Sequence, residues 1–208
     1  LSKEANYKAF FDILMPNDLR LWSLTAAIRQ GISLKLLSQI TMIDPWFIRG
    51  ISNIIDTEKM LLNNSLNKEL LLVAKRHGFT DEQIATLCDS LPDSIKKMRK
   101  QFRIQPSYKM VDTCAAEFEA ATPYFFSTYE GENEAKPLKS SKALVIGSGP
   151  IRIGQGIEFD YSSVHAAIGL EKHGYKSIMV NSNPETVSTD FDASDRLYFE
   201  PLDVEAIE

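Results

Sequence analysis

The sequence contains little cysteine, no long apolar run and no excess of basic residues. Only Cys88 and Cys114 occur among 208 residues. With no CxxC pair and no histidine at ligand spacing, they argue against a disulfide framework and a zinc-binding module. We therefore predict two buried, free thiols, as is usual in a reducing compartment. No apolar run approaches the ~20 residues of a membrane-spanning helix, so we expect no membrane association.

The charge balance argues against nucleic acid as a partner. Acidic residues number 28 against 23 basic ones, which gives a net charge of −5, whereas nucleic-acid recognition needs a basic face. No basic and then apolar leader opens the sequence, so we expect a cytoplasmic protein. The first residue is Leu1 rather than Met, which fits a fragment of a longer chain.

Residues 1 to about 110 have the apolar spacing and the end signals of short helices. Asp44 followed by Pro45 is typical of a helix start, and Thr80 and Gln83 form a predicted capping box. Trp22 and Trp46, each inside a predicted helix, are expected in the core. An exposed aromatic patch for self-association is the less favoured alternative. The predicted helices cover residues 18–30, 34–40, 45–62, 67–77 and 92–102. Because no stretch of this part alternates polar and apolar residues, we predict an all-helical domain over 1–120 and an extended linker over 121–141.

From Lys142 the pattern changes to strands that alternate with helices. Predicted strands near 143–146, 177–180 and 196–200 flank a helix over about 161–173. This alternation favours a parallel sheet with right-handed crossovers. Too little chain follows Lys142 to complete such a domain and add a catalytic one, so we expect an incomplete domain over 142–208.

A glycine-rich loop follows the first of these strands. Gly147 and Gly149 fit the start of a dinucleotide-binding G-x-G-x-x-G fingerprint, but Arg152 occupies its third glycine position. No acidic residue ends the second strand, where a ribose-binding carboxylate would be expected, so a nicotinamide or flavin site is disfavoured. The remaining polar and glycine positions of the loop are Gly154, Gln155, Gly156 and Glu158. They predict a polar, charged crevice.

A second polar loop, Asn183-Pro-Glu-Thr-Val-Ser-Thr-Asp190, follows the second strand. Because loops after parallel strands converge on one edge of the sheet, Glu158 and Glu185 should face one crevice with Arg152 and Asn183. The two carboxylates could act as acid and base or as metal ligands, or each could hold its own loop. Both interpretations stay open for them. For Ser188, Thr189 and Asp190 we expect the loop-holding role.

Several long motifs resemble the large chain of carbamoyl phosphate synthetase. The segments Gly147–Tyr161, Val180–Asp190 and Ser194–Pro201 resemble the opening of its second synthetase half. The segments Thr41–Phe47, Asp112–Phe118 and Thr122–Glu130 resemble the helical oligomerization domain that precedes that half. The resemblance implies a multi-domain protein, α and then α/β: an all-helical oligomerization domain followed by a truncated, Rossmann-like pre-ATP-grasp domain with a parallel sheet.

The resemblance also implies a function. Enzymes of this family are ligases that make carbamoyl phosphate from bicarbonate, glutamine-derived ammonia and two ATP, for arginine or pyrimidine synthesis. In this family two ATP-grasp halves perform the two phosphorylations, and the second one phosphorylates carbamate. A tunnel carries ammonia and then carbamate between the sites. Gly156, Glu158 and Glu185 match positions along that carbamate path. The crevice residues beside them are Gly147, Gly149, Arg152, Gly154, Gln155 and Asn183.

Cofactors and partners follow from the same resemblance. ATP with Mg²⁺ or Mn²⁺ would serve the intact enzyme, a small glutaminase subunit would supply ammonia, and the helical domain would self-associate. Because the ATP-grasp lobes would lie beyond Glu208, we expect no bound cofactor, no metal ligand, no catalytic residue and no turnover in this chain alone. The alternative is a stand-alone interaction module whose α/β tail binds a nucleotide or anion, and a reading frame that stops at Glu208 would favour it.

Overall fold

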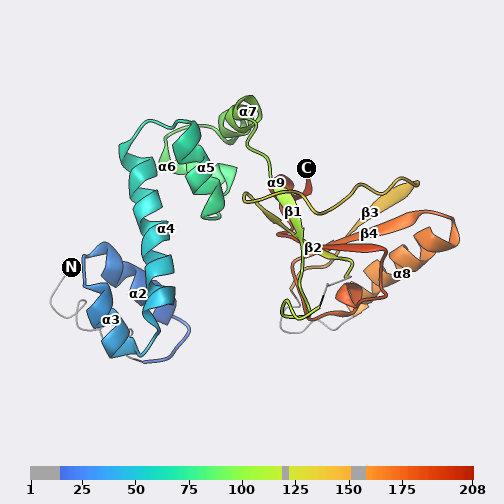
Figure 1. Ribbon diagram of the computed structural model, residues 1–208, viewed down its shortest axis with the longest axis horizontal. Helices are drawn as coiled ribbons and strands as arrows, with labels where there is room; N and C mark the ends of the chain where they lie inside the picture. Colours follow the sequence, from blue (N-terminus) through green and yellow to red (C-terminus); the bar gives the residue numbers. More distant parts are fainter. Residues whose placement is uncertain (1–14, 119–121, 151–157) are drawn as a thin grey trace. The chain divides into compact units, whose positions relative to one another are not determined.

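The structure is a computed structural model that describes residues 15–118, 122–150 and 158–208 (Figure 1). The chain divides into two compact units, Leu1–Phe102 and Arg103–Glu208. The first unit has helices, and the second has a mixed five-stranded sheet with helices.

The helices of the first unit begin and end close to the predicted positions. They are α2 (Arg20–Arg29), α3 (Leu34–Thr41), α4 (Pro45–Asn63), α5 (Lys68–Arg76), α6 (Asp81–Leu87) and α7 (Pro92–Phe102). The carboxylate of Asp44 accepts a hydrogen bond from the N–H of Trp46 at 2.8 Å, with Pro45 in the first turn. Thr80 and Gln83 form the predicted capping box, with bonds of 3.1 and 3.0 Å. Side-chain chemistry therefore sets these helix starts.

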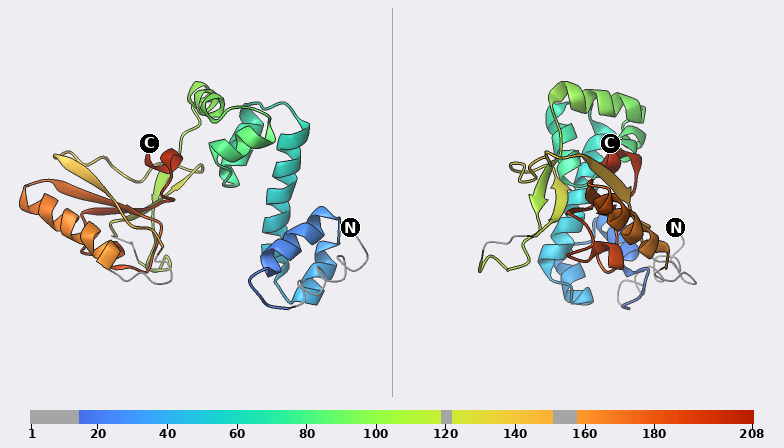
Figure 2. Two further views of the ribbon diagram at one scale, coloured as in Figure 1. Left: turned by 180° about the vertical axis from the view of Figure 1, so that it is seen from behind. Right: turned by 90° about the vertical axis from the view of Figure 1, so that its right-hand side faces the viewer.

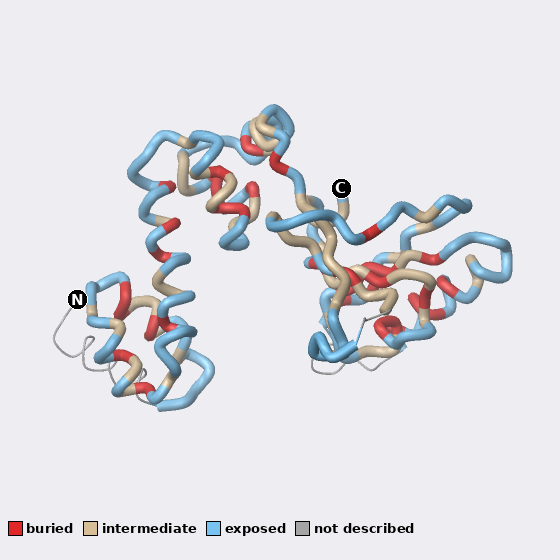
Figure 3. The backbone as a smooth tube through the Cα atoms, in the orientation of Figure 1, coloured by how far each residue is buried: buried red, intermediate tan, exposed pale blue. Residues whose placement is uncertain are grey.

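The core of this unit has an apolar cluster and a buried ion pair. Buried positions recur along α4 and α5 between exposed ones (Figure 3). The cluster contains Leu24, Ala27, Ile28, Leu37, Ile48 and Ile55. Asp81, at the start of α6, accepts from Nε of Arg99 at 2.8 Å and from its Nη2 at 2.7 Å, and Nζ of Lys75 lies 3.5 Å from Asp81. These contacts link α5, α6 and α7.

The expectation that Trp22 and Trp46 are core residues is wrong. Their exposed fractions are 69% and 72%. Trp46 lies in the first turn of α4, where its ring meets Phe47 edge to face at 4.9 Å between centroids. Helical spacing places a side chain on one face of a helix, but it does not determine whether another element covers that face.

The sheet of the second unit has the strand order β1-β2-β5-β4-β3. Its strands are β1 (Ser107–Met110), β2 (Tyr124–Thr128), β3 (Lys142–Ile146), β4 (Lys176–Asn181) and β5 (Arg196–Phe199). β2, β5, β4 and β3 are mutually parallel, and β1 is antiparallel to β2. The predicted parallel arrangement thus holds for β3, β4 and β5, and the sheet as a whole is mixed.

Two strands lie in the part of the chain expected to be helical domain or linker. β2 lies within the segment 121–141 and pairs with β5 through Tyr124 and Leu197, while β1 lies before residue 120. The structure therefore places the division between units at Phe102, not near residue 120. β1 is only four residues long and is half-buried throughout. Its residues, Ser-Tyr-Lys-Met, do alternate polar and apolar side chains, but four residues are too short a run to indicate a strand by themselves.

Helix α8 (Glu158–Lys172) covers one face of the sheet (Figure 2). Ala167 of α8 packs with Met179 and Leu197 in a buried cluster, against which Val145 also lies. The remaining helical segments are the 3-10 helix η1 (Val187–Thr189) and α9 (Val204–Ile207). Because β3 and β4 run parallel and Ile146 pairs with Val180, the loops that follow these strands leave the same edge of the sheet.

Candidate functional site

The described site residues lie at this carboxyl edge. Gly147 and Gly149 follow β3, Asn183 and Glu185 follow β4, and Glu158 is the first residue of α8. The other sequence-predicted residues, Arg152, Gly154, Gln155 and Gly156, lie outside the described residues.

Asn181, the last residue of β4, connects the two loops. Its side chain is fully buried. The Oδ1 atom accepts hydrogen bonds from the backbone N–H of Gly149 at 3.1 Å and from that of Asn183 at 3.3 Å. Its Nδ2 donates to the hydroxyl of Ser188 at 2.9 Å and to Asp160 at 3.3 Å. One amide group thus bonds the glycine loop, the second loop and the start of α8.

Asp160, in the first turn of α8, is the second connecting residue. Its carboxylate is fully buried and accepts from both the N–H and the hydroxyl of Ser188 at 2.7 Å each. It also accepts from the hydroxyl of Thr186 at 2.7 Å and that of Ser148 at 3.2 Å. Burial alone would raise the pKa of Asp160, but the hydrogen bonds from Ser188, Thr186 and Ser148 outweigh it and hold that pKa below its usual value.

Two glycines are required by this geometry. A Cβ atom at Gly147 would lie 2.6 Å from Cγ and Nδ2 of Asn181, closer than real atoms approach. Gly149 has φ of +73°, a backbone conformation that glycine adopts without steric cost. These glycines therefore let the loop pass directly over Asn181.

The structure separates the roles of the polar residues in the second loop. Ser188 is buried against Asp160, and the hydroxyl of Thr189 donates to the carbonyls of Thr186 and Pro184 at 2.8 and 3.2 Å. Their predicted loop-holding role is confirmed. Asp190 is exposed, and within the described residues its carboxylate accepts no hydrogen bond, so that part of the expectation is wrong.

Glu158 and Glu185 are exposed, and neither carboxylate has a hydrogen-bond partner among the residues that the structure describes. Their backbones are nonetheless fixed. Glu158 starts the turn that contains Asp160, and the N–H of Glu185 donates to Oδ1 of Asn183 at 3.1 Å. The side chains are therefore available to a ligand or an intermediate at a defined edge of the sheet.

Asp160 and Asn181 were not predicted from the sequence. Asp160 lies at i, with the buried residues Val164 and Ala167 at i+4 and i+7, so it occupies the apolar face of α8. A carboxylate on that face needs buried donors, and this signal could have identified it.

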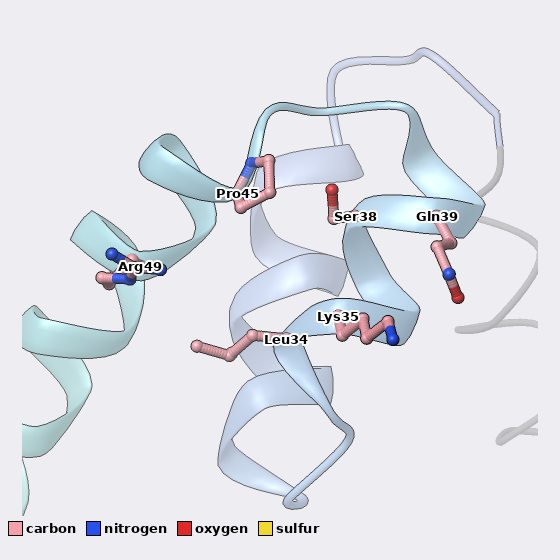
Figure 4. A pocket seen from close by; sticks show the side chains of 6 residues that line it. All are labelled: Leu34, Lys35, Ser38, Gln39, Pro45 and Arg49. Carbon is pink, nitrogen blue, oxygen red and sulfur yellow. The ribbon is translucent and has the colours of Figure 1, made fainter.

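The helical unit also contains a hollow of about 370 Å³, lined by residues of α3 and α4 (Figure 4). Its lining residues are Leu34, Lys35, Ser38, Gln39, Pro45 and Arg49.

Cys88 and Cys114 are free thiols and half-buried, where full burial was expected. In the described parts of the chain, no helix has both the length and the hydropathy of a membrane span.

Comparison with known proteins identifies a family. The carbamoyl-phosphate synthetase large chain oligomerisation domain matches residues 3–103, and the carbamoyl phosphate synthase preATP-grasp domain matches residues 139–208. Carbamoyl phosphate synthase large chains from three organisms are similar over nearly the whole chain.

The large chain of Thermomicrobium roseum is 55% identical over 193 residues, which cover 93% of this chain and 18% of that protein. That of Caldanaerobacter subterraneus subsp. tengcongensis is 53% identical over 196 residues (94% and 18%). That of Methanothermobacter thermautotrophicus is 52% identical over 197 residues (94% and 19%). The chain thus spans less than a fifth of the length of these relatives, and it belongs to the carbamoyl phosphate synthase large chain family.

Proposed function

We propose that this chain is part of the large chain of an ATP-dependent ligase that makes carbamoyl phosphate from bicarbonate, glutamine-derived ammonia and two ATP. In this proposal the helical unit is the oligomerisation domain and the sheet begins the preATP-grasp domain. The observation that carries the proposal is the network of Asn181 and Asp160. It holds the backbones next to Glu158 and Glu185 at one sheet edge.

The sheet edge would serve as part of the carbamate path. Glu158 and Glu185 present carboxylates at neighbouring backbone positions, since Thr186 bonds to Asp160 at 2.7 Å. Exposed carboxylates at fixed positions can orient a small polar intermediate as it passes between two active sites. Gly156 and the other loop residues Arg152, Gly154 and Gln155 remain part of this proposal through the family resemblance alone.

ATP and its metal ions are assigned to other parts of the larger enzyme. In the described residues, no group of three or more His, Cys, Asp or Glu side chains could hold a metal ion. This chain's own residues would support the loops, line the path and associate subunits, and the chain alone would have no turnover.

Self-association is the second part of the proposal. The family model that matches residues 3–103 is named for oligomerisation. Met42, Trp46, Phe47 and Ile54 are large apolar residues with exposed fractions of 87%, 72%, 59% and 46%. Phe47, Gly50 and Ile54 lie at i, i+3 and i+7, on one side of α4. We propose that the face of α4 that carries Phe47 and Ile54 binds a second copy of the chain.

The small glutaminase subunit and the cytoplasmic location remain proposals that rest on the family. A role of the parent enzyme in arginine or pyrimidine synthesis is part of the same proposal.

The test compares the full-length large chain with this 208-residue chain. With the small subunit, ATP, Mg²⁺, bicarbonate and glutamine, the full-length protein should form carbamoyl phosphate and release two ADP for each. This chain, given ammonia in place of glutamine, should form none. A full-length protein that makes no carbamoyl phosphate would refute the proposed activity, and synthesis by this chain alone would refute the assigned role of the fragment.

A further inference from the structure

We propose that Asp160 is a positioning residue of the carbamate path, which sets the spacing between the Glu158 and Glu185 carboxylates. The inference rests on the proposed function and assigns a role to a residue that never meets the intermediate. Asp160 is fully buried, so it can act only through the groups bonded to it.

The bonds of Asp160 reach both loops. Ser148 donates to it from the glycine loop, and Thr186 and Ser188 donate to it from the loop after β4. The carboxylate of Asp160 therefore accepts hydrogen bonds from both loops at once. A change at Asp160 should therefore shift the loops relative to each other.

Glu185 is fixed from both sides by the same network. On one side its N–H bonds to Asn183, whose own N–H bonds to Asn181. On the other side the next residue, Thr186, bonds directly to Asp160. Glu158 lies two residues before Asp160 in the same helical turn. Asp160 thus connects the backbone next to Glu158 with the backbone next to Glu185.

The isosteric variant Asp160→Asn would break this junction. The two carboxylate oxygens receive different donors: Oδ2 receives the Ser188 N–H, and Oδ1 receives Nδ2 of Asn181. The Ser188 N–H cannot reverse its direction. Asn181 cannot turn its amide, because its Oδ1 is needed by Gly149 and Asn183. Either orientation of the new amide therefore sets an NH₂ group against a fixed donor, and the loops must separate.

The test uses the full-length large chain with its small subunit and measures ADP and carbamoyl phosphate in the same sample. In D160N, carbamoyl phosphate synthesis should fall about 10- to 100-fold, as when a group that orients functional residues is lost. ADP release should fall much less, because the first phosphorylation precedes carbamate passage. The ratio of ADP to carbamoyl phosphate should therefore rise.

This ratio distinguishes positioning from simple loss of folded enzyme, which lowers both rates equally. Thr186→Val removes one bond of the network and keeps side-chain size, so it should raise the ratio less than D160N does. Because the change is smaller, T186V should stay folded even if D160N unfolds. Asp192→Asn makes the same charge change at an exposed residue and should leave the ratio at the wild-type value. An unchanged ratio in T186V and in folded D160N would overturn the inference, whereas absence of product from the wild-type enzyme would instead refute the proposed function.

Discussion

At the scale of single residues, the close approach of Gly147 to Asn181 decides how the first loop leaves the sheet. The backbone N–H of Gly147 also donates to the carbonyl of Val180 at 2.7 Å. A methyl group here would displace either the loop or the buried amide, because a Cβ atom would lie 2.6 Å from Nδ2 of Asn181.

We therefore expect Gly147→Ala to lower the free energy of unfolding of the sheet unit by about 1–3 kcal/mol, the usual cost of overpacking. Six of the seven tyrosines lie in this unit and both tryptophans lie in the other. Urea unfolding followed by tyrosine circular dichroism reports the change, while tryptophan fluorescence should not move.

Gly169→Ala is the matched control. Gly169 lies inside α8, and no atom lies within 4 Å of the position that a Cβ atom would take there, so alanine should stabilise the same unit by up to about 1 kcal/mol. Equal effects of the two variants would contradict the close approach at Gly147.

The buried carboxylates predict opposite pH dependences. Hydrogen bonds overcome burial and lower the pKa of Asp160, so its contribution to stability is complete above the unfolded pKa of about 3.9 and is lost as the pH falls through the folded pKa. Burial raises the pKa of Glu200 despite its bonds to Ser127, so its contribution is complete at low pH and is lost as the pH rises. Urea unfolding of the sheet unit between pH 3 and 7 should become less sensitive to acid in D160N, while Glu200→Gln should increase stability mainly above about pH 4.3. The same pH profile in both variants would contradict these assignments.

At the scale of elements, α4 presents two faces of different character. Ile48, Ile55 and Leu61 are buried, whereas Phe47 and Ile54 are exposed. Apolar residues on two sides of one helix are typical of an element that packs within its own unit and also binds a partner.

Phe47→Glu should therefore weaken self-association of the 208-residue chain without unfolding the helical unit. Light scattering across a dilution series should show the dimer dissociating at a concentration at least about 10-fold higher, since a buried charge in an apolar contact costs well over about 1.4 kcal/mol. Leu91→Glu, at a residue with an exposed fraction of 69%, lies outside α4 and should leave the series unchanged. A wild-type chain that is monomeric throughout would exclude this face as a self-association surface.

The elements also differ in how far the sequence determines them. The start of α4 at Asp44 and the start of α6 at Thr80 were predictable, because a side chain bonds to the backbone a few residues away. β1 was not predictable, because its four half-buried residues acquire strand structure only by pairing with β2.

The same distinction applies to the site. Convergence of the two loops follows from parallel strands, and it was predicted. Asp160 and Asn181 were missed because their importance depends on donors that the fold brings from residues 148–149 and 183–188. Local sequence thus determines where individual elements form, whereas tertiary contacts determine which residues connect the elements.

At the scale of the whole molecule, the proposed transfer of an intermediate between two active sites would involve much more protein than this chain. This chain covers 18% of the length of relatives such as the large chain of Thermomicrobium roseum. Its proposed contribution is a wall of the path, with the exposed Glu158 and Glu185 at one sheet edge. Neither side chain supports the fold through a bond to a described residue, so their replacement should spare stability.

The most direct measurement is the number of ADP molecules released per carbamoyl phosphate formed by the full-length enzyme with Glu158→Ala or Glu185→Ala. We expect this number to rise clearly above two in both variants, with little change in melting temperature, because ATP is still consumed while the intermediate is lost. A value of two in both variants, at normal rates of synthesis, would contradict the assignment of these carboxylates to the carbamate path.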